Sequence, residues 1–88
     1  MKVQNMISPA SGREVANQYE IWDDNGVNYF QSYNSIIGKI DKGQVTLDEY
    51  YWDYSVTTGK YRNIWLGEKK AETQKKIDSG EYKLANLN

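Results

Sequence analysis

The alternation of apolar and polar residues predicts a β-hairpin in the first half of the chain. Val15–Trp22 and Val27–Tyr33 are rich in aromatic and β-branched side chains, and Asp24-Asn25-Gly26 lies between them. Asn-Gly is a strong hairpin signal because both residues tolerate positive φ angles. We therefore expect two antiparallel strands joined by a tight turn.

A two-residue turn at Asn25-Gly26 would fix the register of this hairpin. It would place Trp22 opposite Tyr29 and Ile21 opposite Phe30. Because side chains alternate between the faces of a strand, two sets of residues separate. The set predicted to face the core is Tyr19, Ile21 and Phe30. The opposite set mixes aromatic and polar side chains: Gln18, Glu20, Trp22, Tyr29, Gln31 and Tyr33.

A second hairpin is predicted directly after the first. Ser35–Ile40 and Gln44–Leu47 flank Asp41-Lys42-Gly43, where Gly43 suits a left-handed turn position. Asp48–Tyr54 has aromatic side chains at both odd and even positions, so periodicity does not separate a strand from an extended arm. We favour a continued strand for this segment.

The pattern changes to a helical period after Ser55. Tyr61, Ile64 and Trp65 share one helical face, and Gly67 follows as a stop signal. The N-cap candidates of this short helix are Thr57 and Thr58.

A second helix is predicted over Lys70–Ser79, with Gly80 as its stop signal. Glu72 and Lys76 are spaced to pair across one of its turns. Glu81–Asn86 would return as a last strand. Strands followed by helices favour the α+β class, here an antiparallel sheet of three to five strands in two hairpins with two short C-terminal helices.

The length of 88 residues indicates one domain, residues 1–88, because a second core would leave too little to bury in each half. Residues 1–14 contain a cluster of turn-forming residues and are predicted to be a loop or a short edge strand. No apolar run is long enough to cross a bilayer, which favours a soluble, cytoplasmic protein without membrane contact.

Composition removes most catalytic chemistry. The chain has no histidine and no cysteine, which excludes Ser-His-Asp and Cys-His catalysis and the usual zinc sites. Asp23-Asp24-Asn25-Gly26 lacks the later ligands of a calcium loop. Asp53 or Asp78 with Glu81-Tyr82-Lys83 resembles only weakly the arrangement of two acidic residues and a lysine with which some nucleases hold Mg²⁺. We therefore expect no enzyme activity, no metal and no cofactor.

Charge is divided unevenly along the chain. The net charge is −1, yet residues 1–54 carry four Lys or Arg against eight Asp or Glu, and residues 55–88 carry seven against four. A basic patch in the second half could neutralise phosphates, although acidic residues are interleaved with it. The candidate nucleic-acid-binding residues are Lys60, Arg62, Lys69, Lys70, Lys75 and Lys76.

Aromatic residues are the least ordinary feature of the composition, at 14% of the chain. Tyrosine and tryptophan anchor many protein interfaces, and they also stack on the bases of single strands. The alternative is that a small β-rich domain needs large aromatics to fill its core. The candidate protein-binding residues are Trp22, Tyr29, Tyr33, Tyr50, Trp52 and Tyr54.

Three segments resemble a group of short, uncharacterised proteins from bacteriophages and mobile elements. They are residues 29–37, residues 51–61 and residues 80–88. The resemblance implies a small non-enzymatic protein that binds a host macromolecule, as anti-CRISPR and other anti-defence inhibitors do.

The resulting hypothesis is a cytoplasmic inhibitor, in a bacterial host cell, of a defence complex such as a CRISPR effector. Its partner would be a host protein or a ribonucleoprotein. The alternative is a single-stranded nucleic-acid-binding module that uses an aromatic β-face and the C-terminal lysines. Self-association through an edge strand is also compatible with the sequence.

Overall fold

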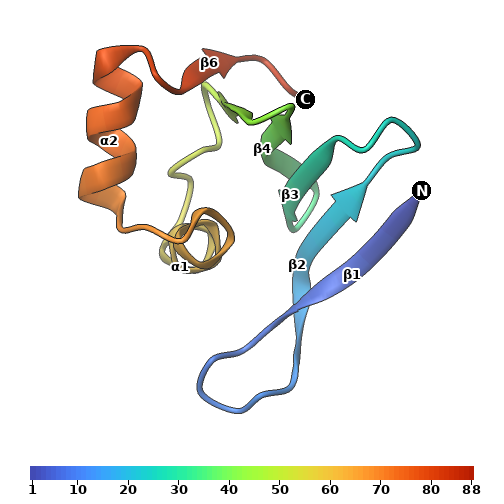
Figure 1. The fold of residues 1–88 in the computed structure, drawn as a ribbon. Coiled ribbons are helices and arrows are strands. Elements are labelled where there is room, and N and C mark those ends of the chain that lie inside the picture. Colours follow the sequence, from blue (N-terminus) through green and yellow to red (C-terminus); the bar gives the residue numbers. More distant parts are fainter.

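The computed structural model describes all 88 residues as a mixed six-stranded sheet with two helices (Figure 1). The elements follow the chain in the order β1 (Lys2–Ile7), β2 (Glu14–Trp22), β3 (Asn28–Ser32), β4 (Ser35–Asp41), β5 (Gln44–Asp48), α1 (Val56–Leu66), α2 (Lys70–Ser79) and β6 (Lys83–Ala85). The strands lie in the sheet in the same order. Neither helix is long and apolar enough to span a membrane.

The α+β class is confirmed, but the sheet differs from the prediction in two respects. It has six strands rather than three to five: residues 2–7 form β1, which is the edge-strand alternative for the N-terminal segment, and the predicted last strand is present as β6, Lys83–Ala85. It is also not wholly antiparallel, since β6 runs parallel to β5. The chain leaves β5 at one end of the sheet, crosses back through both helices and re-enters at the opposite end, where β5 began, which makes a parallel pair.

The register of the β2–β3 hairpin is one residue away from the prediction. Trp22 pairs with Asn28 and Ile21 pairs with Tyr29. The loop has three residues because the Asp23 carboxylate accepts hydrogen bonds from the main chain of Asn25 and Val27, at 2.9 and 3.0 Å. Within that loop Gly26 takes a positive φ and Asn25 does not, as in a type I turn closed by a glycine bulge.

This shift changes which residues face the core. Gln18, Phe30 and Ser32 are buried beneath the helices, whereas Ile21 and Tyr29 lie on the opposite face of the sheet. Phe30 is therefore the one member of the predicted core set that is in the core.

The segment after β5 forms turns rather than the continued strand that we expected. The buried Asp48 carboxylate accepts hydrogen bonds from the main-chain N–H groups of Tyr50 and Tyr51, at 3.0 and 2.8 Å. Its other oxygen accepts from Leu87 N–H and from the side chain of Asn88. A carboxylate that recruits these donors holds the chain in a turn and ends the strand.

The two helices lie close to their predicted positions. α1 begins two or three residues earlier than expected, because its N-cap is Ser55 rather than Thr57 or Thr58; the Ser55 hydroxyl accepts from Thr58 N–H at 3.1 Å. Gly67 and Gly80 end the helices in the left-handed conformation, as predicted.

Two small apolar clusters make up the core between the helices and the sheet. The first joins Met6, Phe30, Ile37 and Tyr61, and the second joins Val45, Leu47 and Tyr82. Trp65 of α1 packs against both clusters and donates from its indole to Asn28 at 2.8 Å. Gly38 makes room for this arrangement, since a Cβ at that position would lie 2.7 Å from Leu47 and 3.0 Å from Trp65.

Candidate functional site

An exposed aromatic surface lies where the β3–β4 turn meets the start of α1. Its members are Tyr33, Tyr50, Tyr51, Tyr54 and Val56, which we call the tyrosine patch. Tyr50 is 75% exposed, Tyr54 is 62% exposed and Val56 is 92% exposed. Exposed large apolar side chains that cluster, unlike single ones, are typical of an interaction surface.

The rings of the patch contact one another. Tyr51 lies between Tyr50 and Tyr54, with centroid distances of 4.8 and 5.3 Å and edge-to-face angles of 74° and 64°. Tyr51 also packs against the core cluster around Phe30. The outer two rings are thus supported by an anchored ring, which lowers the entropy lost when a partner binds.

The segment that carries these rings is fixed by Asp48. Burial opposes ionisation of the Asp48 carboxyl, but the hydrogen bonds from Leu87, Tyr51, Asn88 and Tyr50 outweigh it and hold its pKa below the ordinary value of 3.8. The charged carboxylate therefore ties the tyrosine segment to the C-terminal residues of the chain.

Tyr33 reaches the patch from the turn between β3 and β4. Its φ angle is 55°, a left-handed conformation that is unfavourable for a bulky side chain. Its N–H donates to Asn17 at 2.7 Å, which helps to hold this conformation. Glycine would adopt this backbone conformation without strain. Residues that are held in strained backbone conformations cluster at functional sites.

A hollow in the surface separates Tyr33 from Tyr51 and Tyr54. Its remaining lining is polar or belongs to the start of α1: Ser32, Asn34, Ser35, Ser55, Val56 and Thr57. Aromatic walls with hydroxyl and amide groups between them suit a partner side chain that has an apolar body and a polar end.

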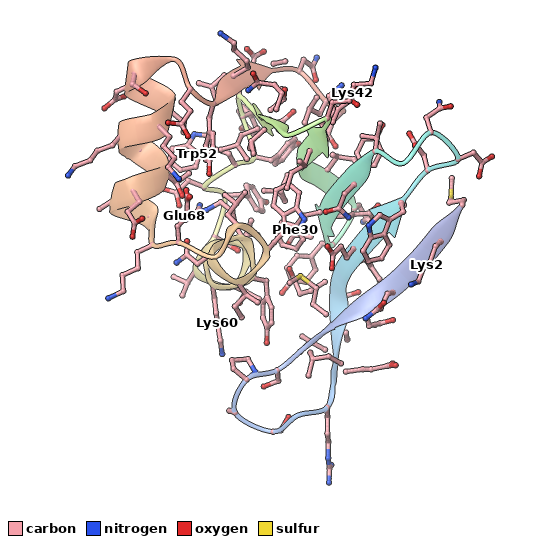
Figure 2. All side chains as sticks on the ribbon, viewed as in Figure 1. Lys2, Phe30, Lys42, Trp52, Lys60 and Glu68 are labelled. Carbon is pink, nitrogen blue, oxygen red and sulfur yellow. The ribbon has the colours of Figure 1, made fainter.

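The structure brings together three of the six predicted protein-binding residues, Tyr33, Tyr50 and Tyr54. Trp52 lies near α2 (Figure 2), half-buried against the second core cluster and next to the Arg62 guanidinium. Trp22 and Tyr29 lie on opposite faces of the sheet, because the hairpin register differs from the predicted one. They do not form a common surface with Tyr33.

Three of the six predicted nucleic-acid-binding side chains are occupied by acidic partners. Arg62 is 1% exposed and donates to Asp53 at 3.2 Å and to the Trp52 carbonyl at 2.7 Å. Lys70 binds Asp53 at 2.5 Å, and Lys76 binds Glu68 at 2.8 Å rather than the predicted Glu72. The other three of these six, Lys60, Lys69 and Lys75, make no ion pair. Lys60 points away from the sheet (Figure 2).

Glu68 is the centre of a second internal polar network. It accepts hydrogen bonds from Thr73, Tyr82 and Lys76, at 2.6 to 2.8 Å. Burial opposes its ionisation, but these donors hold its pKa below the ordinary value of 4.5. Burial and the Glu68 carboxylate raise the pKa of the Tyr82 phenol. The network joins the start of α2 to Tyr82, directly before β6, and so stabilises the layer formed by α1 and α2, which we call the helical layer.

No three acidic side chains come together as a metal site. Asp53 is committed to Arg62 and Lys70, and these contacts, working against burial, lower its pKa. Asp78 accepts from Gln74 at 3.0 Å. Asp53 and Asp78 thus serve contacts of the helices in this fold.

Sequence reasoning missed Tyr51 and Val56 as members of the patch. Val56 directly follows Ser55, so an N-cap assignment at that serine would have placed Val56 in the first turn of α1, where it is exposed. Tyr51 could not have been separated from Tyr50 and Tyr54 by periodicity, because the segment is a turn.

Neither the curated proteins nor the solved structures contain a significant match to this chain. A family model, in contrast, spans residues 1–81 of the sequence. The chain therefore belongs to the family of unknown function DUF8033.

Proposed function

We propose that this protein is a non-catalytic binding protein that contacts a protein partner through the tyrosine patch. The observation that carries the proposal is the clustering of exposed rings on a fixed support, with Tyr50 and Tyr54 both held against the anchored Tyr51. Tyrosine is enriched among the residues that dominate binding energy at protein interfaces.

The choice of a protein over a nucleic acid follows from charge. Binding to phosphates needs several free cations, and three of the six candidate side chains are tied to carboxylates. The hollow between Tyr33 and Tyr54 is lined by no charged residue at all. An interface built on it would depend on apolar contact and short hydrogen bonds.

The kind of partner is a further step of the same proposal. The resemblance to small phage proteins makes a component of a bacterial defence complex, such as a CRISPR effector, the specific partner to test. Binding would then act by blocking a surface of that complex in the host cytoplasm.

The test is a tagged pull-down from bacterial lysate, with nuclease treatment, read by mass spectrometry. The wild-type chain is compared with the double variant Tyr50→Ser/Tyr54→Ser and with Lys69→Ser/Lys75→Ser as a matched surface control. We expect a defined protein that the wild type and the lysine variant retain and the tyrosine variant loses. Retention by all three, or recovery that disappears with nuclease, would contradict the proposal.

A further inference from the structure

The two edges of the sheet are protected to different degrees. β6, at one edge, has only three residues. β1, at the other edge, has six residues and no proline, and its one charged residue is Lys2. The Lys2 ammonium lies 5.0 Å from the centroid of the Trp22 ring in the neighbouring strand, so it is directed back over its own sheet. Short strands, prolines and outward charges are the usual edge protection, and β1 has none of them.

The outward main-chain groups of β1 can be assigned from both of its ends. Ser8 N–H donates to Arg13 O at 2.9 Å, so the main chain of Ser8 faces β2. Residues of a strand direct these groups alternately to either side, so those of Ile7 face outward. At the other end Asp23 N–H donates to Val27 O, so the main chain of Asp23 faces β3 and that of Trp22, one residue earlier, faces β1. Trp22 pairs with Lys2, so the main chain of Lys2 faces β2. The main chain of Val3 therefore faces outward.

β1 keeps this alternation along its whole length. The register with β2 shifts between Asn5 and Ile7, but the extra residues lie in β2. Only Met6 lies between these two residues in β1, whereas Val15 to Gln18 lie between their partners in β2. Val3, Asn5 and Ile7 therefore share both an outward-facing main chain and one face of the sheet. Val3 is 57% exposed and Ile7 is 45% exposed.

We propose that β1 pairs antiparallel with β1 of a second copy of this chain, about a twofold axis at Asn5. Asn5 then lies opposite Asn5 of the partner subunit, and Val3 lies opposite Ile7 of the partner subunit. Each of these pairs brings two outward-facing main chains together, so each can exchange two hydrogen bonds. The register also gives each exposed apolar side chain of β1 an apolar neighbour.

This register satisfies two further requirements. The two Lys2 side chains lie at opposite ends of the paired strands, so like charges are kept apart. The pairing also repeats the same patch on both subunits, as a closed twofold interface requires. It uses none of the residues of the tyrosine patch, so it stands independently of the proposed function.

The test combines a measured mass with a cross-link. Sedimentation equilibrium of the full chain, at concentrations up to about 1 mM, is expected to give twice the monomer mass of 10.2 kDa. A mass that stays at 10.2 kDa at every concentration would overturn the proposal.

Because the chain has no cysteine, single substitutions report the register cleanly. Asn5→Cys places two thiols opposite each other, at about 5.5 Å between Cα atoms, within the range of a disulfide. Gln4→Cys, whose side chain lies on the other face, is the control. We expect a covalent dimer for Asn5→Cys at least tenfold faster than for Gln4→Cys. Equal rates, a faster rate for Gln4→Cys, or no dimer from either would rule out the pairing.

Discussion

The tyrosine patch and the helical layer differ in whether their side chains find partners within the protein. In the helical layer the buried charges are matched: Arg62 has Asp53, and Glu68 has Lys76 and Tyr82. In the patch, Tyr50 and Tyr54 are large exposed side chains whose rings both pack against the ring of Tyr51. The polar contacts of the helical layer are therefore satisfied within the protein, whereas the patch leaves large apolar side chains exposed.

The largest effect on stability is expected from Asp48, which supports the patch from beneath. In Asp48→Asn an amide NH₂ replaces one oxygen, so either the N–H groups of Tyr50 and Tyr51 or that of Leu87 lose their acceptor. The free energy of unfolding should fall by about 3 kcal/mol. Chemical denaturation measures it, and Glu49→Gln, one residue along the chain, is the control.

The loss of stability at acid pH is expected to depend on Asp48 and on two other carboxylates. The pKa values of Asp48, Asp53 and Glu68 are lower in the folded chain than their ordinary values. Their contribution is complete above the ordinary values of 3.8 and 4.5 and is lost as pH falls through the folded values. Stability should be level from neutral pH to about pH 5 and fall below about pH 4. A shallower acid limb in Asp48→Asn would confirm the assignment, and an unchanged one would contradict it.

Arg62→Met separates stability from binding. Methionine keeps the stem packed on Trp52 but cannot donate to Asp53 or to the Trp52 carbonyl. We expect a loss of about 2 kcal/mol in the free energy of unfolding, measured by denaturation. The folded fraction should bind the captured partner as the wild type does; a parallel loss of affinity would place Arg62 in the interface.

Tyr33→Gly should have opposite effects on the two properties. Glycine adopts the left-handed conformation without strain, so the fold should gain up to about 1 kcal/mol. Loss of the ring should weaken partner binding at the same time. Tyr33→Phe, which keeps the ring and the strain, is the control for both readouts. Equal affinity of Tyr33→Gly and wild type would remove Tyr33 from the patch.

The smallest effect is expected from the free cations of α2. Lys69→Ala/Lys75→Ala removes two exposed charges that make no ion pair. The melting temperature and the affinity for a protein partner should both change little. A marked drop in affinity that depends on salt would favour the nucleic-acid alternative instead.

The sequence was most informative where a residue has a local role. Gly67 and Gly80 end helices because a residue that adopts positive φ without strain suits those positions. A glycine after a helical pattern can be recognised from the sequence alone. Asp23 and Asp48 misled the prediction, because each carboxylate captures main-chain donors: Asp23 lengthened a turn by one residue, and Asp48 ended a strand. The capture by Asp48 depends on its burial and on partners far along the chain, such as Leu87, whereas Asp23 captures donors of its own turn.

Only part of the tyrosine patch could be predicted from the sequence, for a related reason. The abundance of aromatic side chains was plain, but whether each ring is buried depends on the register and on which turn carries it. Trp52 and Tyr54 are two residues apart, yet Trp52 is half-buried against the second core cluster and Tyr54 is exposed. Only the path of the turn after Asp48 separates them.

The most direct test of the binding role is the affinity of the purified chain for the captured partner, compared between Tyr54→Ala and Lys69→Ala by calorimetry. The account predicts that Tyr54→Ala weakens binding by about thirtyfold, or 2 kcal/mol, with an unchanged melting temperature, and that Lys69→Ala binds as the wild type does. Equal affinities for Tyr54→Ala and the wild type would show that the tyrosine patch is not the binding surface.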